Sequence, residues 1–103
     1  MPSIEQLQKM LKSEPRDAFL RYALAMEYAK QNQFADALRE FRTLLDAHPD
    51  YVAGYFMMGR TQAQSGDTKS AADTYRKGID VAKEKGDLHA AGEISDALEE
   101  LTS

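Results

Sequence analysis

The sequence predicts an all-α protein, and three observations carry that prediction. Ala, Leu, Glu, Gln, Lys and Met are plentiful, whereas the chain has only 6 glycines and 3 prolines, a composition that favours helices. No stretch of useful length alternates apolar and polar residues with a period of two, as a half-buried strand would. Pro15 and Pro49 lie 34 residues apart and each follows an apolar stretch with helical spacing, which indicates a repeated pair of helices.

The first helix is predicted to run from Ser3 to Ser13. Gln6 follows Ser3 by three positions, and this pair resembles a capping box, in which each side chain bonds the backbone of the other residue. The apolar residues of this segment recur at helical spacing and form one stripe. The stripe consists of Ile4, Leu7, Met10 and Leu11.

Two more helices are predicted to form a hairpin before the second proline. Asp17 is a good N-cap for a helix that extends to Gln31. A short polar turn at 31–33 separates it from a third helix, Phe34–Ala47. This helix stops before Pro49, because proline cannot continue a helix.

The remainder of the chain holds three predicted helices. The fourth covers Tyr51–Gln64 and ends at a turn around Gly66. The fifth covers Thr68–Lys85, where Gly86 can adopt the left-handed conformation that often follows a helix. The sixth begins at Asp87 and ends near Leu101. Its apolar stripe consists of Leu88, Ala91, Ile94, Leu98 and Leu101.

Length and composition exclude several classes of protein. The 103 residues are expected to form a single domain, 1–103, and the absence of cysteine excludes disulfides and thiolate metal sites. A net charge of −4 has the wrong sign for a nucleic-acid-binding protein. The longest apolar run, Tyr22–Met26, is far shorter than the ~18 residues of a membrane helix, and Met1–Ser13 has no apolar core of a signal peptide. We therefore expect no nucleic-acid or membrane partner, and a cytoplasmic location by default.

The two halves of the chain match when one is shifted by 34 residues. Small residues coincide where two helices of one unit must approach closely, and aromatic residues coincide where they are expected to fill the space between units. The coinciding pairs are Tyr22 with Phe56, Leu24 with Met58, Ala25 with Gly59, Ala37 with Ala71, and Phe41 with Tyr75. A period of this length with two helices per unit is typical of a helical solenoid.

These positions resemble the tetratricopeptide repeat family, whose pattern is W-x2-L-G-x2-Y, then A-x3-F, then P. The first unit supplies Leu24-Ala25-x2-Tyr28, Ala37-x3-Phe41 and Pro49, and the second supplies Tyr55-x2-Met58-Gly59 and Ala71-x3-Tyr75. The chain departs from the pattern where Arg21 replaces Trp, Gln62 replaces Tyr and Lys83 replaces Pro. The resemblance implies a right-handed helix-hairpin solenoid of about six antiparallel helices.

The repeat register divides the domain into four segments. They are a half-repeat helix at 1–15, a first repeat at 18–51, a second repeat at 52–85 and a capping helix at 86–103. The first and last helices each have one apolar stripe backed by polar residues, as the ends of a solenoid require. We expect them to cap a short array.

Catalytic chemistry has little support in the sequence. His48 and His89 are isolated and belong to no cluster with the spacing of metal ligands. The carboxylates Asp96, Glu99 and Glu100 are interpreted as a solvated helix face. Nucleotide-binding and nucleophile motifs are absent. We therefore predict no enzyme, no cofactor and no metal.

The family resemblance implies a concave groove lined by the first helix of each unit. Aromatic and methionine side chains there can supply apolar contact, and a basic side chain can orient an acidic group. The alternative is that Tyr22 and Phe56 simply pack against neighbouring helices. The candidate groove residues are Phe19, Tyr22, Met26, Lys30, Phe56, Arg60 and Gln64.

One subtype of the family clamps the terminal carboxylate of heat-shock chaperones with Lys, Asn and Arg side chains. The matching positions hold Tyr22, Met26, Met57, Asp87 and Ala91. None of them matches the clamp, and Asp87 has the opposite charge. Chaperone C-terminal tails are therefore not expected as partners.

Two functions from different classes remain. The first is a non-catalytic protein–protein interaction module that binds a peptide or a partner helix in the groove. The second is a self-associating structural protein whose apolar groove or edge forms a homodimer. The apolar residues gathered within Tyr51–Met58 favour the second function, because one helix can bury only part of them inside its own unit.

Overall fold

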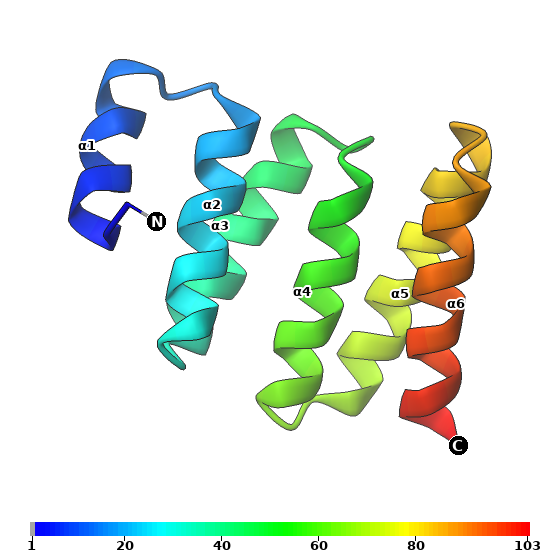
Figure 1. Cartoon of the computed structure of the whole chain (residues 1–103). Coiled ribbons are helices and arrows are strands. Elements are labelled where there is room, and N and C mark those ends of the chain that lie inside the picture. Colours follow the sequence, from blue (N-terminus) through cyan, green and yellow to red (C-terminus); the bar gives the residue numbers. More distant parts are fainter. Residues whose placement is uncertain (1) are drawn as a thin grey trace.

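The computed structural model describes residues 2–103 and builds every regular element within them as an α-helix. Consecutive helices run antiparallel and are joined by short turns (Figure 1). The six helices are α1 (Ile4–Ser13), α2 (Ala18–Lys30), α3 (Phe34–Ala47), α4 (Val52–Gln64), α5 (Thr68–Glu84) and α6 (Leu88–Thr102). The all-α prediction and the order of its helices are confirmed.

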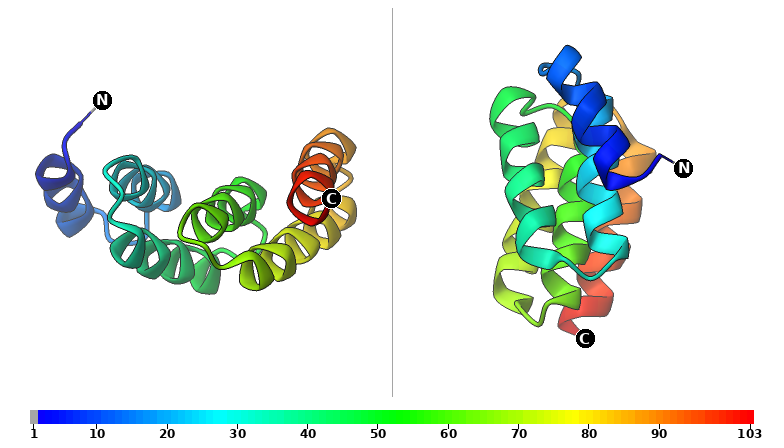
Figure 2. Two further views of the ribbon diagram at one scale, coloured as in Figure 1. Left: turned by 90° about the horizontal axis from the view of Figure 1, so that it is seen from below. Right: turned by 90° about the vertical axis from the view of Figure 1, so that its left-hand side faces the viewer.

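The helices form two curved rows, as in a solenoid of helix hairpins. Figure 2 shows α2, α4 and α6 along the inner, concave side of the arc, with α3 and α5 along its outer side. Each helix packs on the next along the chain, and the inner helices also touch each other, α2 with α4 and α4 with α6. The molecule extends over 39 × 30 × 21 Å. The predicted unit boundaries at 18–51 and 52–85 enclose the hairpins α2–α3 and α4–α5.

The helix ends follow from local capping chemistry. Ser3 and Gln6 form the predicted capping box at the start of α1. Asp17 Oδ1 accepts a hydrogen bond from the Leu20 backbone N–H at 3.0 Å, which caps α2 as predicted. Beyond the end of α5, Gly86 has a φ of 76°, the predicted left-handed conformation.

The close approach of the two helices within a unit depends on small residues. A Cβ atom on Gly59 of α4 would overlap with the ring of Tyr75 on α5. In the first unit Ala25 and Ala37 are both fully buried. These contacts confirm the role predicted for the small positions.

The aromatic residues of the outer helices make contacts within their own units. We predicted that Phe41 and Tyr75 fill the space between units. Phe41 packs edge-on against Tyr22 of its own unit at a centroid distance of 6.5 Å. Tyr75 lies 6.3 Å from Phe56 and against Gly59 of its own unit, and it also borders α6 of the following segment. The missing side chain at Gly59 opens the space that the Tyr75 ring occupies.

Two residues of the predicted terminal stripes are exposed. Met10 on α1 is 45% exposed, and Leu88 on α6 is 72% exposed. Ala91 and Ile94, by contrast, are buried as predicted. Met10 and Leu88 lie on sides of the two end helices that no other helix of the described chain covers. None of the helices in residues 2–103 is long and apolar enough to span a bilayer.

Candidate binding groove

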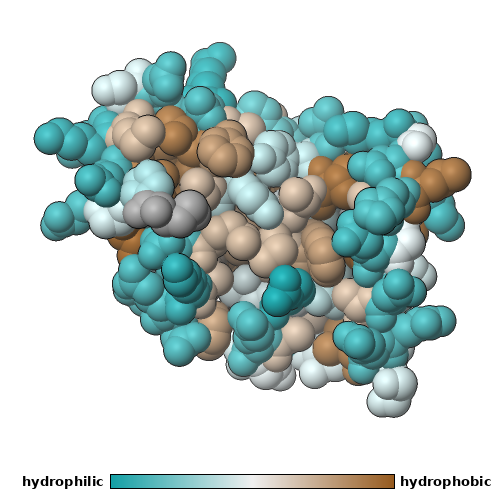
Figure 3. Space-filling model, viewed as in Figure 1, coloured by the Kyte–Doolittle hydropathy of each residue, from teal (hydrophilic) through white to brown (hydrophobic). Residues whose placement is uncertain are grey.

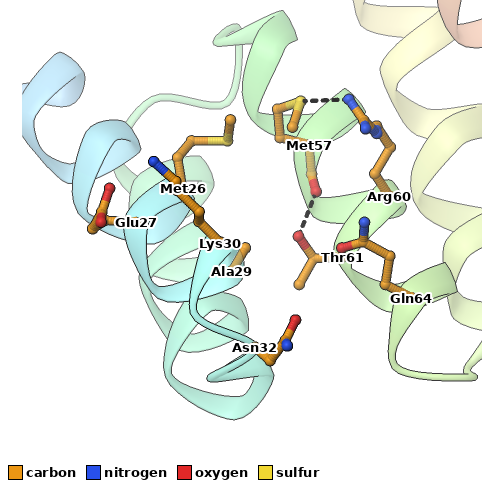
Figure 4. A pocket seen from close by; sticks show the side chains of 9 residues that line it. All are labelled: Met26, Glu27, Ala29, Lys30, Asn32, Met57, Arg60, Thr61 and Gln64. Carbon is orange, nitrogen blue, oxygen red and sulfur yellow. Dashed lines mark hydrogen bonds between the residues drawn. The ribbon is translucent and has the colours of Figure 1, made fainter. Parts of the chain in front are cut away.

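A furrow runs along the concave face between α2 and α4. It encloses about 340 Å³, and its side chains come from both helices and from the turn after α2 (Figure 4). The hydropathy surface of this face shows a central apolar band bordered by hydrophilic side chains (Figure 3). The residues lining the furrow are Met26, Glu27, Ala29, Lys30, Asn32, Met57, Arg60, Thr61 and Gln64. We call it the α2–α4 furrow.

The floor of the α2–α4 furrow is made of half-buried apolar groups. Met26 and Ala29 come from α2 and Met57 from α4. Thr61 also borders the floor but is 2% exposed, and its Oγ1 donates a hydrogen bond to the Met57 carbonyl at 2.8 Å. Because thioethers are flexible and polarizable, this floor can adapt to differently shaped apolar side chains.

Two basic side chains give the rim of the furrow its charge. Lys30 and Arg60 are exposed on opposite helices, and Glu27 is the acidic residue of the lining. Arg60 Nη1 lies 3.9 Å from the Met57 sulfur, so the guanidinium group is next to the apolar floor. An apolar group in the furrow would therefore have a basic group beside it that can bind a carboxylate.

A second furrow follows between α4 and α6 and encloses about 470 Å³. Arg60 and Gln64 belong to both furrows and form the ridge between them. Burial raises the pKa of Tyr22 and that of Tyr75, and the charge of the nearby Arg60 acts against this rise in both. The second furrow is lined by Phe56, Arg60, Ala63, Gln64, Tyr75, Ala97, Glu100 and Leu101. Glu100 makes it less basic than the α2–α4 furrow.

The structure separates the seven candidate groove residues into three groups. The α2–α4 furrow brings together Met26, Lys30, Arg60 and Gln64. The second furrow brings Phe56 together with Arg60 and Gln64. Tyr22 is half-buried, 5.4 Å from Tyr51 and 6.5 Å from Phe41 by ring centroids, which agrees with the packing alternative. Phe19 lines neither furrow and is 66% exposed.

Sequence reasoning missed several lining residues. Met57 and Thr61 share a helical stripe with Arg60 and Gln64, spaced i, i+3, i+4 and i+7, and this spacing was the available signal. Asn32 reaches the furrow from a turn in which its φ is 61°, a left-handed conformation that asparagine tolerates. A polar turn after an amphipathic helix offers no comparable signal.

The two histidines lie apart from both furrows. His48 is the C-cap of α3, with Nε2 3.2 Å from the Arg16 carbonyl oxygen. His89 Nε2 lies 3.5 Å from Glu93 on the exposed side of α6. Within residues 2–103, no three His, Asp or Glu side chains form a group that could hold a metal ion.

A stack of helix hairpins with furrows along its inner helices defines a helical repeat protein. Residues 22–87 match the model of one such family, described as tetratricopeptide repeat. Since the match spans more than half of the chain, the chain belongs to the tetratricopeptide repeat family.

Two proteins with substantial sequence identity share most of their length with this chain. A TPR repeat-containing protein of Pseudomonas aeruginosa is 29% identical over 98 residues, which cover 95% of this chain and 93% of the relative. A solved tetratricopeptide repeat domain protein from Salinibacter ruber is 39% identical, with a TM-score of 0.80, and the match covers 84% of this chain and 88% of that one.

Two structures of complexes share the fold at lower identity. The TPR2B-domain:pHsp70 complex of yeast Sti1 is 21% identical with a TM-score of 0.90, and the match covers 96% of this chain and 79% of that one. PcrH in complex with the chaperone binding region of PopD is 16% identical with a TM-score of 0.87, and the match covers 96% and 75%.

Proposed function

We propose that this chain is a non-catalytic protein–protein interaction module that binds a peptide or a partner segment in the α2–α4 furrow. The observation that carries the proposal is the side-by-side placement of an apolar floor, Met26 and Met57, and a basic rim, Lys30 and Arg60. The proposal includes no catalytic step, cofactor or metal.

The chemistry of the furrow defines the segment it would take. One apolar side chain fits a space of about 340 Å³ and removes thioether surface from water. A carboxylate next to that side chain would accept charge-assisted hydrogen bonds from Arg60 or Lys30. The ligand is therefore a segment with an apolar anchor and a neighbouring acidic residue.

Two structures with the same fold support a protein-binding role. The Sti1 domain is in complex with pHsp70, and PcrH is in complex with a region of PopD. The proposed furrow lacks the side chains of the chaperone-tail clamp, because Met26 and Met57 occupy clamp positions. The exclusion of chaperone C-terminal tails is part of the proposal.

The rival function, a homodimer through the apolar groove or edge, loses part of its basis. Its argument was the apolar cluster within Tyr51–Met58. Tyr55 and Met58 are buried, and the other large members of the cluster are half-buried within the chain itself. Tyr51, for example, packs on Tyr22 of α2. Little of this cluster is left for a second copy to cover.

Selection from a random peptide library on the immobilised protein tests the proposal. We expect enriched peptides that carry an apolar residue beside Asp or Glu. Arg60→Glu should weaken their binding at least tenfold, because it reverses the charge next to the furrow floor. Arg42→Glu is the matched control, since Arg42 is also exposed but lies on the outer helix α3. Binding that Arg60→Glu leaves unchanged would contradict the proposal.

A further inference from the structure

The inner helices α2 and α4 present an apolar face towards the helices that follow them in the chain. On α2 and α4 every residue of this face is apolar or glycine, and every one is buried or half-buried. The Phe41 ring lies against Tyr22, and the Tyr75 ring lies against Gly59. The face consists of Ala18, Tyr22, Ala25 and Ala29 on α2, and of Val52, Phe56, Gly59 and Ala63 on α4. We call it the trailing face.

The trailing face of α6 is fully exposed. Counted from the N-caps Asp17, Tyr51 and Asp87, the same four positions fall on Leu88, Gly92, Ser95 and Glu99. All four are exposed, and Leu88 is 72% exposed. Gly92 and Ser95 are small, and a Cβ on Gly92 would meet nothing within 4 Å among the described residues. A helix could therefore approach α6 closely on this side.

The opposite end of the molecule has the complementary gap. Met10 of α1 is the repeat equivalent of Leu44 on α3, 34 residues later, and of Gly78 on α5, 68 residues later. Leu44 is fully buried. A Cβ on Gly78 would contact Tyr55 of α4 and Ile94 of α6, so this position lies between two inner helices. Among residues 2–103, α2 is the one helix that packs on α1, and Met10 is 45% exposed.

A shallow depression marks the open side of α1. It encloses about 540 Å³, and Gln6, Lys9 and Met10 line it together with Pro2 and Ser13. Gln6 is the 34-residue equivalent of Glu40, which binds Arg21 of the adjacent inner helix at 2.6 Å. In the first unit, the position of Glu40 on α3 faces the inner helix α2. The depression therefore marks the side of α1 on which an inner helix would pack if α1 were used as α3 is.

The two open sides also differ in charge. Glu93, Asp96, Glu99 and Glu100 give α6 four acidic residues and no Lys or Arg. The α1 helix has Lys9 and Lys12 against the single acid Glu5. The exposed acidic helix and the exposed basic side chains thus lie at opposite ends of one molecule.

We propose that copies of this chain associate head to tail, with α6 of one copy packed antiparallel on α1 of the next. The two helices would complete a helix hairpin like α2–α3 and α4–α5. In this arrangement Leu88, at the start of α6, meets Met10, at the end of α1, and the net basic helix α1 packs on the acidic helix α6. Such an interface joins two different surfaces, so it leaves a free end on each side and continues beyond a dimer.

The molar mass of the 103-residue protein in solution tests this proposal. Sedimentation equilibrium over a hundredfold concentration range should give a weight-average mass that rises past twice 11.5 kDa and falls when salt is added. A mass that stays at 11.5 kDa, or one that stops at twice this value, would overturn the proposal. Neither result depends on the peptide ligand of the α2–α4 furrow.

Two variants with one blocked end each make the test specific. Met10→Glu blocks α1 and Leu88→Glu blocks α6, and each variant alone should be monomeric. An equimolar mixture should form a complex of two chains and no more. The intact α6 of the Met10→Glu variant can bind the intact α1 of the Leu88→Glu variant, and both remaining ends are blocked. A mixture that stays monomeric while circular dichroism shows both variants folded would overturn the proposal.

Phe19→Glu provides the matched control. Among residues 2–103, Phe19 is exposed like Met10 and Leu88 and is also large and apolar. Its 34-residue equivalent, Ala53, is exposed even though a complete unit precedes it, so stacking of units does not cover this position. The Phe19→Glu variant should therefore associate like the wild type, and a monomeric Phe19→Glu protein would count against the proposed interface.

Discussion

Gly59 lies against the ring of Tyr75 so closely that any side chain would overlap with it. Tyr75 is 3% exposed, and its ring also packs on Phe56. The contact joins α4 to α5 and sets the distance between the two helices of this unit. The equivalent positions in the first unit hold Ala25 and Phe41, which are both fully buried.

The first prediction concerns this contact. Gly59→Leu should lower the free energy of unfolding by about 1–3 kcal/mol, because the side chain overpacks a buried interface. Thermal and urea unfolding would measure the change. Gly92→Ala is the control, since Gly92 is an exposed glycine inside α6, and alanine there should stabilise by about 0.5–1 kcal/mol. Equal effects of the two substitutions would contradict the packing described.

The second prediction separates two aromatic residues of α2. Tyr22→Ala should destabilise by about 1–3 kcal/mol, because its ring packs on Phe41 and Tyr51. Phe19→Ala should change stability by no more than about 0.5 kcal/mol, because Phe19 is 66% exposed. Chemical denaturation of both variants measures the difference. A stable Tyr22→Ala variant would return this residue to the list of free groove contacts.

The third prediction concerns a buried polar atom. Tyr28 Oη accepts a hydrogen bond from Gln8 at 2.9 Å. Gln62 is the 34-residue equivalent of Tyr28 and is 5% exposed, but the Oε1 atom of Gln62 has no hydrogen-bond partner within residues 2–103. Gln62→Leu should therefore stabilise the protein by about 1–2 kcal/mol, because it removes an unsatisfied acceptor. Gln64→Leu is the control at an exposed site, and unfolding midpoints should separate the two. A loss of stability in Gln62→Leu would refute the prediction.

The fourth prediction concerns acid stability. Asp67 caps α5 by accepting the Ser70 backbone N–H at 3.1 Å, and hydrogen bonds from the side chain and backbone of Ser70 lower the pKa of Asp67 below 3.8. A lowered pKa means that the folded state holds the proton less tightly than the unfolded state. The stability that the ionised cap contributes is thus complete above about pH 3.8 and is lost as the pH falls through the lower, folded-state pKa.

Asp67→Asn keeps a residue that can cap α5 but removes the titrating group. The melting temperature of the wild type should therefore fall more steeply than that of Asp67→Asn between pH 4 and pH 2, in a range set by the pKa of Asp67. Parallel curves for the two proteins would show that the cap does not titrate.

Much of the local structure could be predicted because its causes lie within a few residues. The Ser3–Gln6 box, the Asp17 cap and the glycine at 86 mark helix ends, and the structure has all three. The 34-residue offset likewise located the small positions, since the same packing problem recurs in each unit. These signals depend on neighbours along the chain or on a regular repeat.

The candidate site could be predicted only in part. Periodicity identified a stripe containing Tyr22 and Met26 but could not tell that Tyr22 packs on Tyr51 while Met26 lines the furrow. That difference depends on the distance between α4 and α2, and the spacing of apolar residues within α2 gives no information about this distance. Met57 was missed for the same reason, because its side chain closes the furrow from the other helix.

By itself the sequence determined the helices, their order and the 34-residue register, because capping, propensity and apolar periodicity act locally. Only the tertiary structure decided which side chains stay open to a partner. Met10 and Leu88 belong to apolar stripes, yet they are exposed, because burial requires a second helix at the right distance and the end helices have one only on one side. Arg60 is exposed for a different reason, because it lies on the ridge between the two furrows of the concave face.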